Sequence, residues 1–330
     1  MRRNNEDRTK TRRAQAEAVN PAAVLDFVTP TEFVELPSKG IGYPSGHPLH
    51  NQETIEIRFM TAKDEDILTS RSLLKKGIAL ERLIDNLLVD KTYKAKDVLV
   101  GDRNAIIIAA RSSAYGHLYE TKVQCPSCQN SQKLTFDLSN PLIIDGDLEE
   151  FDVEETEVGT YVVNTPKSGI KVELRLLTGA DESKIVKIMS KNAKEEEIVS
   201  TQMKLYINSV NGHDGDVFVN YFVDNVPAYE GRWLRKCYES LAPNIKVSEE
   251  FECESCGFEQ EMEVPFNTDF FGLTSEYMQN VYEVFFTLKH YGGWALSEMY
   301  SLPVGLRKWW LDRTIQEFEK EKEEYDKAKR

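Results

Sequence analysis

Residues 99–128, LVGDRNAIIIAARSSAYGHLYETKVQCPSC, join a run of apolar residues to a pair of cysteines. The run at 105–110 is apolar on every side, which is typical of a helix in the middle of a core. Asp102 is placed to cap this helix at its N-terminus. Residues 117–139 then have the character of strands around the cysteine pair. This stretch predicts a central buried helix followed by a hairpin.

Toward the N-terminus, residues 54–59 alternate with a period of two, which predicts a strand. Thr61 and Asp64 have the spacing of a capping box, so a helix should follow and end near Gly77. Residues 80–88 repeat apolar side chains at helical spacing and predict an amphipathic helix. Acidic pairs such as Asp64 and Asp66 are expected to lie on a solvated helix end.

Two further N-terminal segments look surplus to a core. Residues 37–48 form a loop rich in proline and glycine, and residues 1–22 form a basic arm. The arm is either a solvated tail or a segment that becomes ordered on an acidic partner. No apolar segment follows its positive charges, so we do not expect a secretory signal.

Beyond residue 140 the composition changes, since residues 145–157 contain eight acidic residues and no basic one. We interpret this segment as a linker or exposed face at the start of a second module. Strands are expected at 161–163 and 172–177, and helices at 181–192, 195–210 and 228–241.

The chain should be helical from Pro265 to its end, with a break at Gly292 and Gly293 and with Pro303 at the first position of the last helix. Adjacent Trp309 and Trp310 point about 100° apart on a helix, so one core face should not bury both. They belong either to an interface or to a helical bundle.

Two C-x-x-C pairs carry the chemistry of the sequence, namely Cys125 with Cys128 and Cys253 with Cys256. Each pair lies between strand-like segments, and CPSCQNSQKLTF at 125–136 resembles CESCGFEQEMEV at 253–264. Such knuckles bind one Zn²⁺ through four thiolates. Gly257 suits the turn after the second knuckle, where a positive φ is often needed. We therefore predict a zinc ribbon whose two halves are separated by an inserted domain.

Other interpretations of the cysteines are weaker. Reduced, metal-free thiols are the main alternative, whereas a redox pair would need a strand-to-helix junction. Four thiolates leave no open position on the metal, so zinc should be structural rather than catalytic. Cys237 is expected to be an ordinary helix residue. Five cysteines are too few for a disulfide scaffold, which favours a reducing cytoplasm.

The charge and the motifs of the chain disfavour several classes of function. Forty-one basic and 55 acidic residues give a net charge of −14, which disfavours nucleic acid and anionic membranes as partners. Glutamates surround the second knuckle, and no apolar run approaches the ~20 residues that span a bilayer. Common enzyme motifs are absent, and the histidines are scattered, at His47, His50, His117, His213 and His290. We expect neither catalysis nor a small-molecule substrate.

Three segments resemble the baseplate hub proteins of contractile-tailed bacteriophages: PSKGIGYPSGHPL (37–49), IRFMTAKDEDILTS (57–70) and residues 99–128. The likeness covers about residues 33–139. The segment at 292–321, GGWALSEMYSLPVGLRKWWLDRTIQEFEKE, is similar to the C-terminal part of the same proteins, while residues 141–248 match nothing we recognise. The resemblance implies a structural part of the virion tail, assembled in the host cytoplasm, with other baseplate, hub or tail-tube proteins as partners. An assembly chaperone that leaves the particle is the alternative.

Together, these patterns predict an α+β fold with an N-terminal α/β core, a four-cysteine zinc ribbon split by an inserted α+β domain, and C-terminal helices. The expected parts are the flexible arm (1–22), the core with the first knuckle (23–140), the insertion (141–248), and the second knuckle with the helices (249–330).

Overall fold

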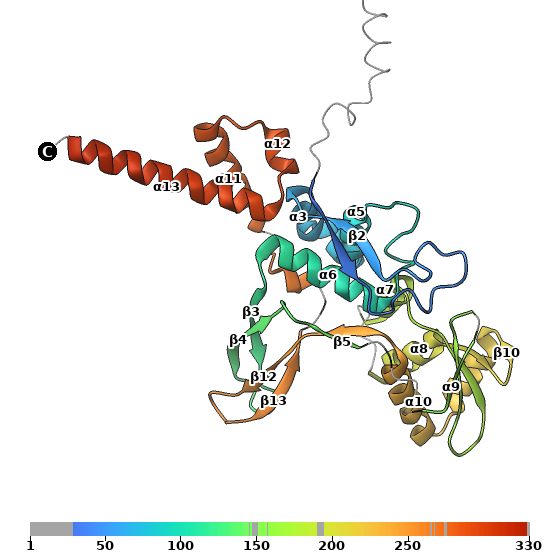
Figure 1. The fold of residues 1–330 in the computed structure, drawn as a ribbon. Coiled ribbons are helices and arrows are strands. Elements are labelled where there is room, and N and C mark those ends of the chain that lie inside the picture. Colours follow the sequence, from blue (N-terminus) through green and yellow to red (C-terminus); the bar gives the residue numbers. More distant parts are fainter. Residues whose placement is uncertain are drawn as a thin grey trace, which may run out of the picture.

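The computed structural model describes residues 29–144, 146, 151–156, 158–189, 195–264, 266, 268–273 and 276–328. The basic arm and five of the eight acidic residues at 145–157 lie outside these residues. Figure 1 shows small antiparallel sheets around a central helix, with the last helix pointing away from the body. None of the described helices is long and apolar enough to cross a membrane.

The N-terminal part packs a two-stranded sheet and three short helices onto one long helix, α6. Its elements are β1 (Thr31–Glu35), β2 (Thr54–Arg58), α3 (Ala62–Thr69), α4 (Arg71–Lys76), α5 (Ala79–Leu87) and α6 (Val100–Tyr115). Almost every residue from Gly101 to Arg111 is buried. The helix predicted from its apolar run is therefore central to the core, as expected.

The middle of the chain adds two hairpin strands and an open sheet flanked by helices. The elements are β3 (Leu118–Gln124), β4 (Ser131–Asp137), β5 (Leu142–Ile144), β6 (Val153–Glu155), β7 (Tyr161–Asn164), β8 (Lys171–Leu174), α7 (Gly179–Met189), α8 (Glu195–Tyr206), β9 (Ile207–Val210), β10 (His213–Asp214), α9 (Asp216–Asn225) and α10 (Ala228–Leu241). Five of these strands form one sheet in the order β10-β9-β8-β7-β6.

The remaining elements return to the first hairpin and then become helical. They are β11 (Asn244–Lys246), β12 (Ser248–Glu252), β13 (Glu259–Glu263), a 3₁₀ turn (Thr268–Phe271), α11 (Tyr277–Gly292), α12 (Leu296–Ser301) and α13 (Val304–Ala328). β11 pairs with β5, and β12 pairs with β13. All strand pairs of the described residues are antiparallel, so the α+β class is confirmed.

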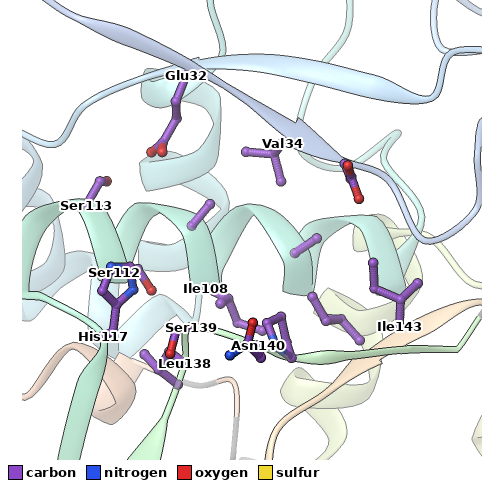
Figure 2. A pocket seen from close by; sticks show the side chains of 15 residues that line it. Glu32, Val34, Ile108, Ser112, Ser113, His117, Leu138, Ser139, Asn140 and Ile143 are labelled. Carbon is purple, nitrogen blue, oxygen red and sulfur yellow. The ribbon is translucent and has the colours of Figure 1, made fainter.

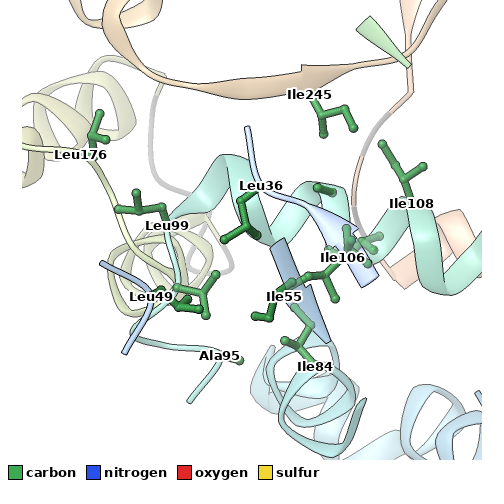
Figure 3. Close-up of a cluster of buried hydrophobic side chains, with 14 of the residues drawn as sticks. Leu36, Leu49, Ile55, Ile84, Ala95, Leu99, Ile106, Ile108, Leu176 and Ile245 are labelled. Atoms are coloured by element: carbon green, nitrogen blue, oxygen red, sulfur yellow. The ribbon is translucent and has the colours of Figure 1, made fainter. Parts of the chain in front are cut away.

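One large cluster of buried side chains joins the N-terminal part to the middle of the chain. Ile55 from β2, Ile106 from α6, Leu176 beyond β8 and Ile245 from β11 belong to it, and Figure 3 shows them facing a shared interior. At about 25 cal/mol per Å² of apolar surface, burial on this scale is the main stabilising term.

The Pro/Gly loop at 37–48 folds against α6, which corrects the expectation that it is surplus to the core. Asp102 explains the difference. It is fully buried in the first turn of α6, and its carboxylate accepts hydrogen bonds from Ser38 N (3.0 Å), Ser38 Oγ (2.7 Å) and Tyr43 Oη (2.7 Å). Instead of capping its own helix, Asp102 fastens the loop.

Replacing Tyr43 by Phe should lower the free energy of unfolding by about 1–3 kcal/mol. The Tyr43 hydroxyl donates to Asp102 and also accepts from Leu99 N at 3.0 Å, so its removal leaves a buried N–H unsatisfied. Urea denaturation measures the effect. Tyr221→Phe is the control, because the Tyr221 side chain is 73% exposed and its loss should change stability by less than about 0.5 kcal/mol.

Several boundaries differ from the sequence predictions. The helix expected to run to Gly77 is interrupted at Ser70, whose extended backbone separates α3 from α4. The helix expected at 195–210 ends at Tyr206, because the next four residues form β9 and pair with β8. The last helix begins at Val304, one residue after Pro303.

Two acidic residues of α3 are fully buried, which corrects the expectation of a solvated helix end. Asp64 accepts a 2.8 Å hydrogen bond from the Thr61 N–H, as in a capping box, and it also pairs with Arg58 at 2.8 Å. Neighbouring Glu65 pairs with Arg307 of α13. The start of α3 therefore fastens both the N-terminal sheet and the C-terminal helices.

Trp309 and Trp310 have different environments, as their spacing on the helix predicts. Trp310 packs against Trp294, with ring centroids 5.1 Å apart, whereas Trp309 is 54% exposed. Beyond this point α13 is mainly solvated and projects from the body (Figure 1).

Candidate metal centre

Two β-hairpins from distant parts of the chain bring the four cysteines together. The hairpin β3–β4 carries Cys125 and Cys128 in its turn, and β12–β13 carries Cys253 and Cys256. The two hairpins lie next to each other in Figure 1, where β12 packs beside β4.

The two turns have the same backbone geometry. Cys125 N donates to Asn130 O at 2.8 Å, and Cys253 N donates to Phe258 O at 2.9 Å. Four residues after each first cysteine the chain enters the left-handed region, with φ of 59° at Gln129 and 66° at Gly257. The turn predicted from Gly257 is confirmed, and the first knuckle repeats it with a residue that carries a side chain.

Replacing Gly257 by Ala should destabilise the protein by about 1 kcal/mol, whereas Gln129→Ala should be nearly neutral. A Cβ at residue 257 would meet no atom within 4 Å, so the cost is that of a left-handed backbone alone. Gln129 already adopts this left-handed backbone with a side chain in place, so its replacement by Ala adds no such cost. Thermal unfolding of the two variants provides a matched comparison, and an equal loss in both would contradict the prediction.

The four thiols converge on a single point. Their Sγ atoms all lie within 4.8 Å of one another, with Cys125 and Cys256 at 3.8 Å and Cys128 and Cys253 at 3.6 Å. A tetrahedral Zn²⁺ with Zn–S bonds of about 2.3 Å places its sulfurs about 3.8 Å apart. Disulfide sulfurs would be about 2 Å apart. The donor set and its spacing therefore fit a zinc site with four thiolate ligands.

Apolar packing and one amide hold the hairpins in register. Cys125 and Cys253 are buried with Phe251 in a small cluster, while Cys128 and Cys256 are exposed. The Gln132 side chain bridges the hairpins, since it donates to Glu252 O at 2.8 Å and accepts from Glu254 N at 3.0 Å. This arrangement closes one side of the site and leaves the other at the surface.

The electrostatics of the cluster favour a thiolate at Cys253. Burial raises its pKa, but the backbone N–H groups of Ser255 and Cys256 and neighbouring thiols together lower that pKa to about 7. At Cys256 the Phe258 N–H lowers the pKa, yet the Cys128 and Cys253 side chains and desolvation raise it overall to about 12. Without a cation, repulsion between neighbouring thiolates prevents all four cysteines from ionising. A divalent metal would remove this repulsion because it would neutralise part of their negative charge.

The remaining sequence candidates do not join this centre. Cys237 is fully buried in α10, within the large core cluster. None of the five histidines belongs to a group of described residues able to hold a metal. Gln132 is the residue at the site that sequence reasoning missed, because its role depends on the neighbouring hairpin.

Residues 31–272 match the family described as T4 bacteriophage base plate protein. The match covers well over half of the chain and includes both cysteine turns. The chain belongs to this base plate family. The base plate protein matches no curated protein and no solved structure.

Membership confirms the resemblance to phage baseplate proteins and indicates a structural role in the virion tail. The match also extends beyond the segments that carry the resemblance, because residues 141–248 lie inside the matched range. The helical end from α11 onward lies outside it.

Proposed function

We propose that this base plate protein is a structural component of the baseplate hub of a contractile-tailed phage, assembled in the host cytoplasm and held by one structural Zn²⁺. Cys125, Cys128, Cys253 and Cys256 would bind the metal. The observation that carries the proposal is the family match, because it spans both hairpins on which these cysteines lie.

Zinc would act as a clamp between the two ends of the segment at 141–248. Both hairpins flank that segment, and β5 and β11 pair at its base. A metal bound to both turns would fix how the parts of the chain beyond each hairpin are oriented. The proposed parts remain 1–22, 23–140, 141–248 and 249–330. Because zinc binds only the folded arrangement, it would also contribute folding free energy.

The surface of the C-terminal helices offers sites for contacts with other proteins. Exposed large apolar side chains gather on α11 and α13, among them Phe286, Tyr291 and Trp309. Aromatic residues are enriched among the interface residues whose truncation to alanine costs the most affinity. Other baseplate, hub or tail-tube proteins are the proposed partners.

Quantitative mass spectrometry of purified phage tests the proposal. A virion component should occur in fixed proportion to the other tail proteins and should stay in tails purified through a density gradient. Its presence only in infected cells, and its absence from particles, would overturn the proposal and favour an assembly chaperone.

A further inference from the structure

A groove of about 530 Å³ crosses one face of α6, away from the cysteines (Figure 2). β1 forms one wall through Glu32, Val34 and Glu35, and residues 138–143 form the other. Ala105, Ile108 and Ala109 of α6 form its floor. The groove is thus apolar at its base and bordered by a strand.

The edge of β1 that borders the groove is unpaired. Phe59 N donates to Pro30 O, and Leu36 N donates to Glu53 O, so even-numbered residues of β1 direct their backbone groups to β2. Thr31, Phe33 and Glu35 direct theirs to the opposite edge. No β2 residue lines the groove, and no hydrogen bond of these outward groups is found among the described residues. An open edge of this kind accepts an added strand.

Two buried polar atoms of the groove lack partners. Glu32 Oε1 and Ser112 Oγ make no hydrogen bond with the residues that the structure describes. In Figure 2 the Glu32 side chain points from β1 toward α6, where Ser112 and Ser113 lie. A buried acceptor without a donor is costly, so a ligand that brings an N–H group to this end of the groove would recover that cost.

The groove is acidic rather than basic. Its lining includes the carboxylates of Glu32 and Glu35 and no lysine or arginine, and His117 is its one other titratable side chain. Desolvation also raises the pKa of Glu32, although a hydrogen bond with Ser113 opposes this shift. A positively charged side chain that reaches Glu32 would therefore find both an opposite charge and an unused acceptor.

We propose that this groove binds an extended, basic segment of a partner protein, which pairs with the open edge of β1 and places an arginine or lysine against Glu32. Apolar side chains two positions away would contact Val34, Ile108 and Ile143. Five residues of β1 can pair with about five partner residues, a length of about 17 Å. The proposal rests on the proposed function only in placing the partner among other phage tail proteins.

Selection from a random library of 12-residue peptides against the full chain tests the inference without knowledge of the partner. We expect an enriched family with one arginine or lysine and apolar residues at alternate positions around it. A synthetic peptide of that family should bind Glu32→Gln about tenfold more weakly, because a charge-assisted hydrogen bond is lost. Glu53→Gln, at an exposed residue outside the groove, should bind as the wild type does.

Two further probes test pairing with the strand edge. Phe33→Pro removes an outward N–H that β2 does not use, and proline is tolerated at strand edges, so the variant should fold and lose at least about tenfold in affinity. N-methylation of the alternate peptide amides that face β1 should have the same effect, whereas N-methylation of the other set should not.

An absence of any enriched family would overturn the proposal, as would enriched peptides without a basic residue or with equal affinity for Glu32→Gln. Self-association of the chain that Phe33→Pro abolishes would identify a second copy as the occupant and would also overturn it. Zinc content and presence in the virion do not depend on these results, so failure here is distinguishable from failure of the proposed function.

Discussion

Replacing Cys253 by Ser is expected to abolish stable zinc binding and to lower the free energy of unfolding by at least about 5 kcal/mol. Structural zinc sites contribute roughly 10–16 kcal/mol of apparent binding free energy, and three thiolates cannot complete the closed shell. Cys253 is also buried beside Cys125 and Phe251, so its loss disturbs the contact between the hairpins. Elemental analysis of the purified protein and thermal unfolding measure the two effects.

Cys237→Ala is the matched control for zinc content. Cys237 is buried in α10, so this variant removes a buried thiol without touching the cluster and should keep one zinc per chain. A chelator should reproduce the loss of stability in the wild type and leave Cys253→Ser unchanged. Wild-type protein that is purified with four free thiols and no metal, yet is equally stable, would contradict the prediction.

The sequence predicts those features that depend on local spacing. The knuckles, the capping box at Thr61 and the left-handed turn at Gly257 each involve residues within four positions of one another, and the structure has all three. The burial of the helix around residues 105–110 is also local, because an apolar run without a polar face has no solvated side.

The features that the sequence does not predict depend on distant partners. Asp102 has the spacing of a helix cap, but its hydrogen bonds come from Ser38 and Tyr43, 64 and 59 positions earlier. Residues 207–210 continue a helical pattern, yet pairing with β8 makes them a strand. The burial of Glu65 cannot be predicted from local sequence either, because its partner Arg307 is 242 positions away. Tertiary contacts overrule local preference in each case.

Arg307→Met should destabilise the protein by about 3–5 kcal/mol, the usual cost of leaving a buried charge without its partner. Glu65 is fully buried, and Arg307 donates to both of its carboxylate oxygens, at 2.7 and 2.8 Å. The hydroxyls of Tyr115 and Tyr277 donate to the same carboxylate at 3.1 and 2.8 Å, but neither carries a positive charge.

The matched control is Arg313→Met, which removes an exposed ion pair with Glu317 in the same helix and should cost less than about 1 kcal/mol. A double variant, Glu65→Leu with Arg307→Met, removes both charges and should recover part of the loss. Urea denaturation of the four proteins separates the cost of an orphaned charge from that of lost packing. Equal losses for Arg307→Met and Arg313→Met would show that the buried pair does not hold α13 to the core. The expected result instead makes Glu65 the point at which α3, α6, α11 and α13 are joined, since each contributes one group to this network.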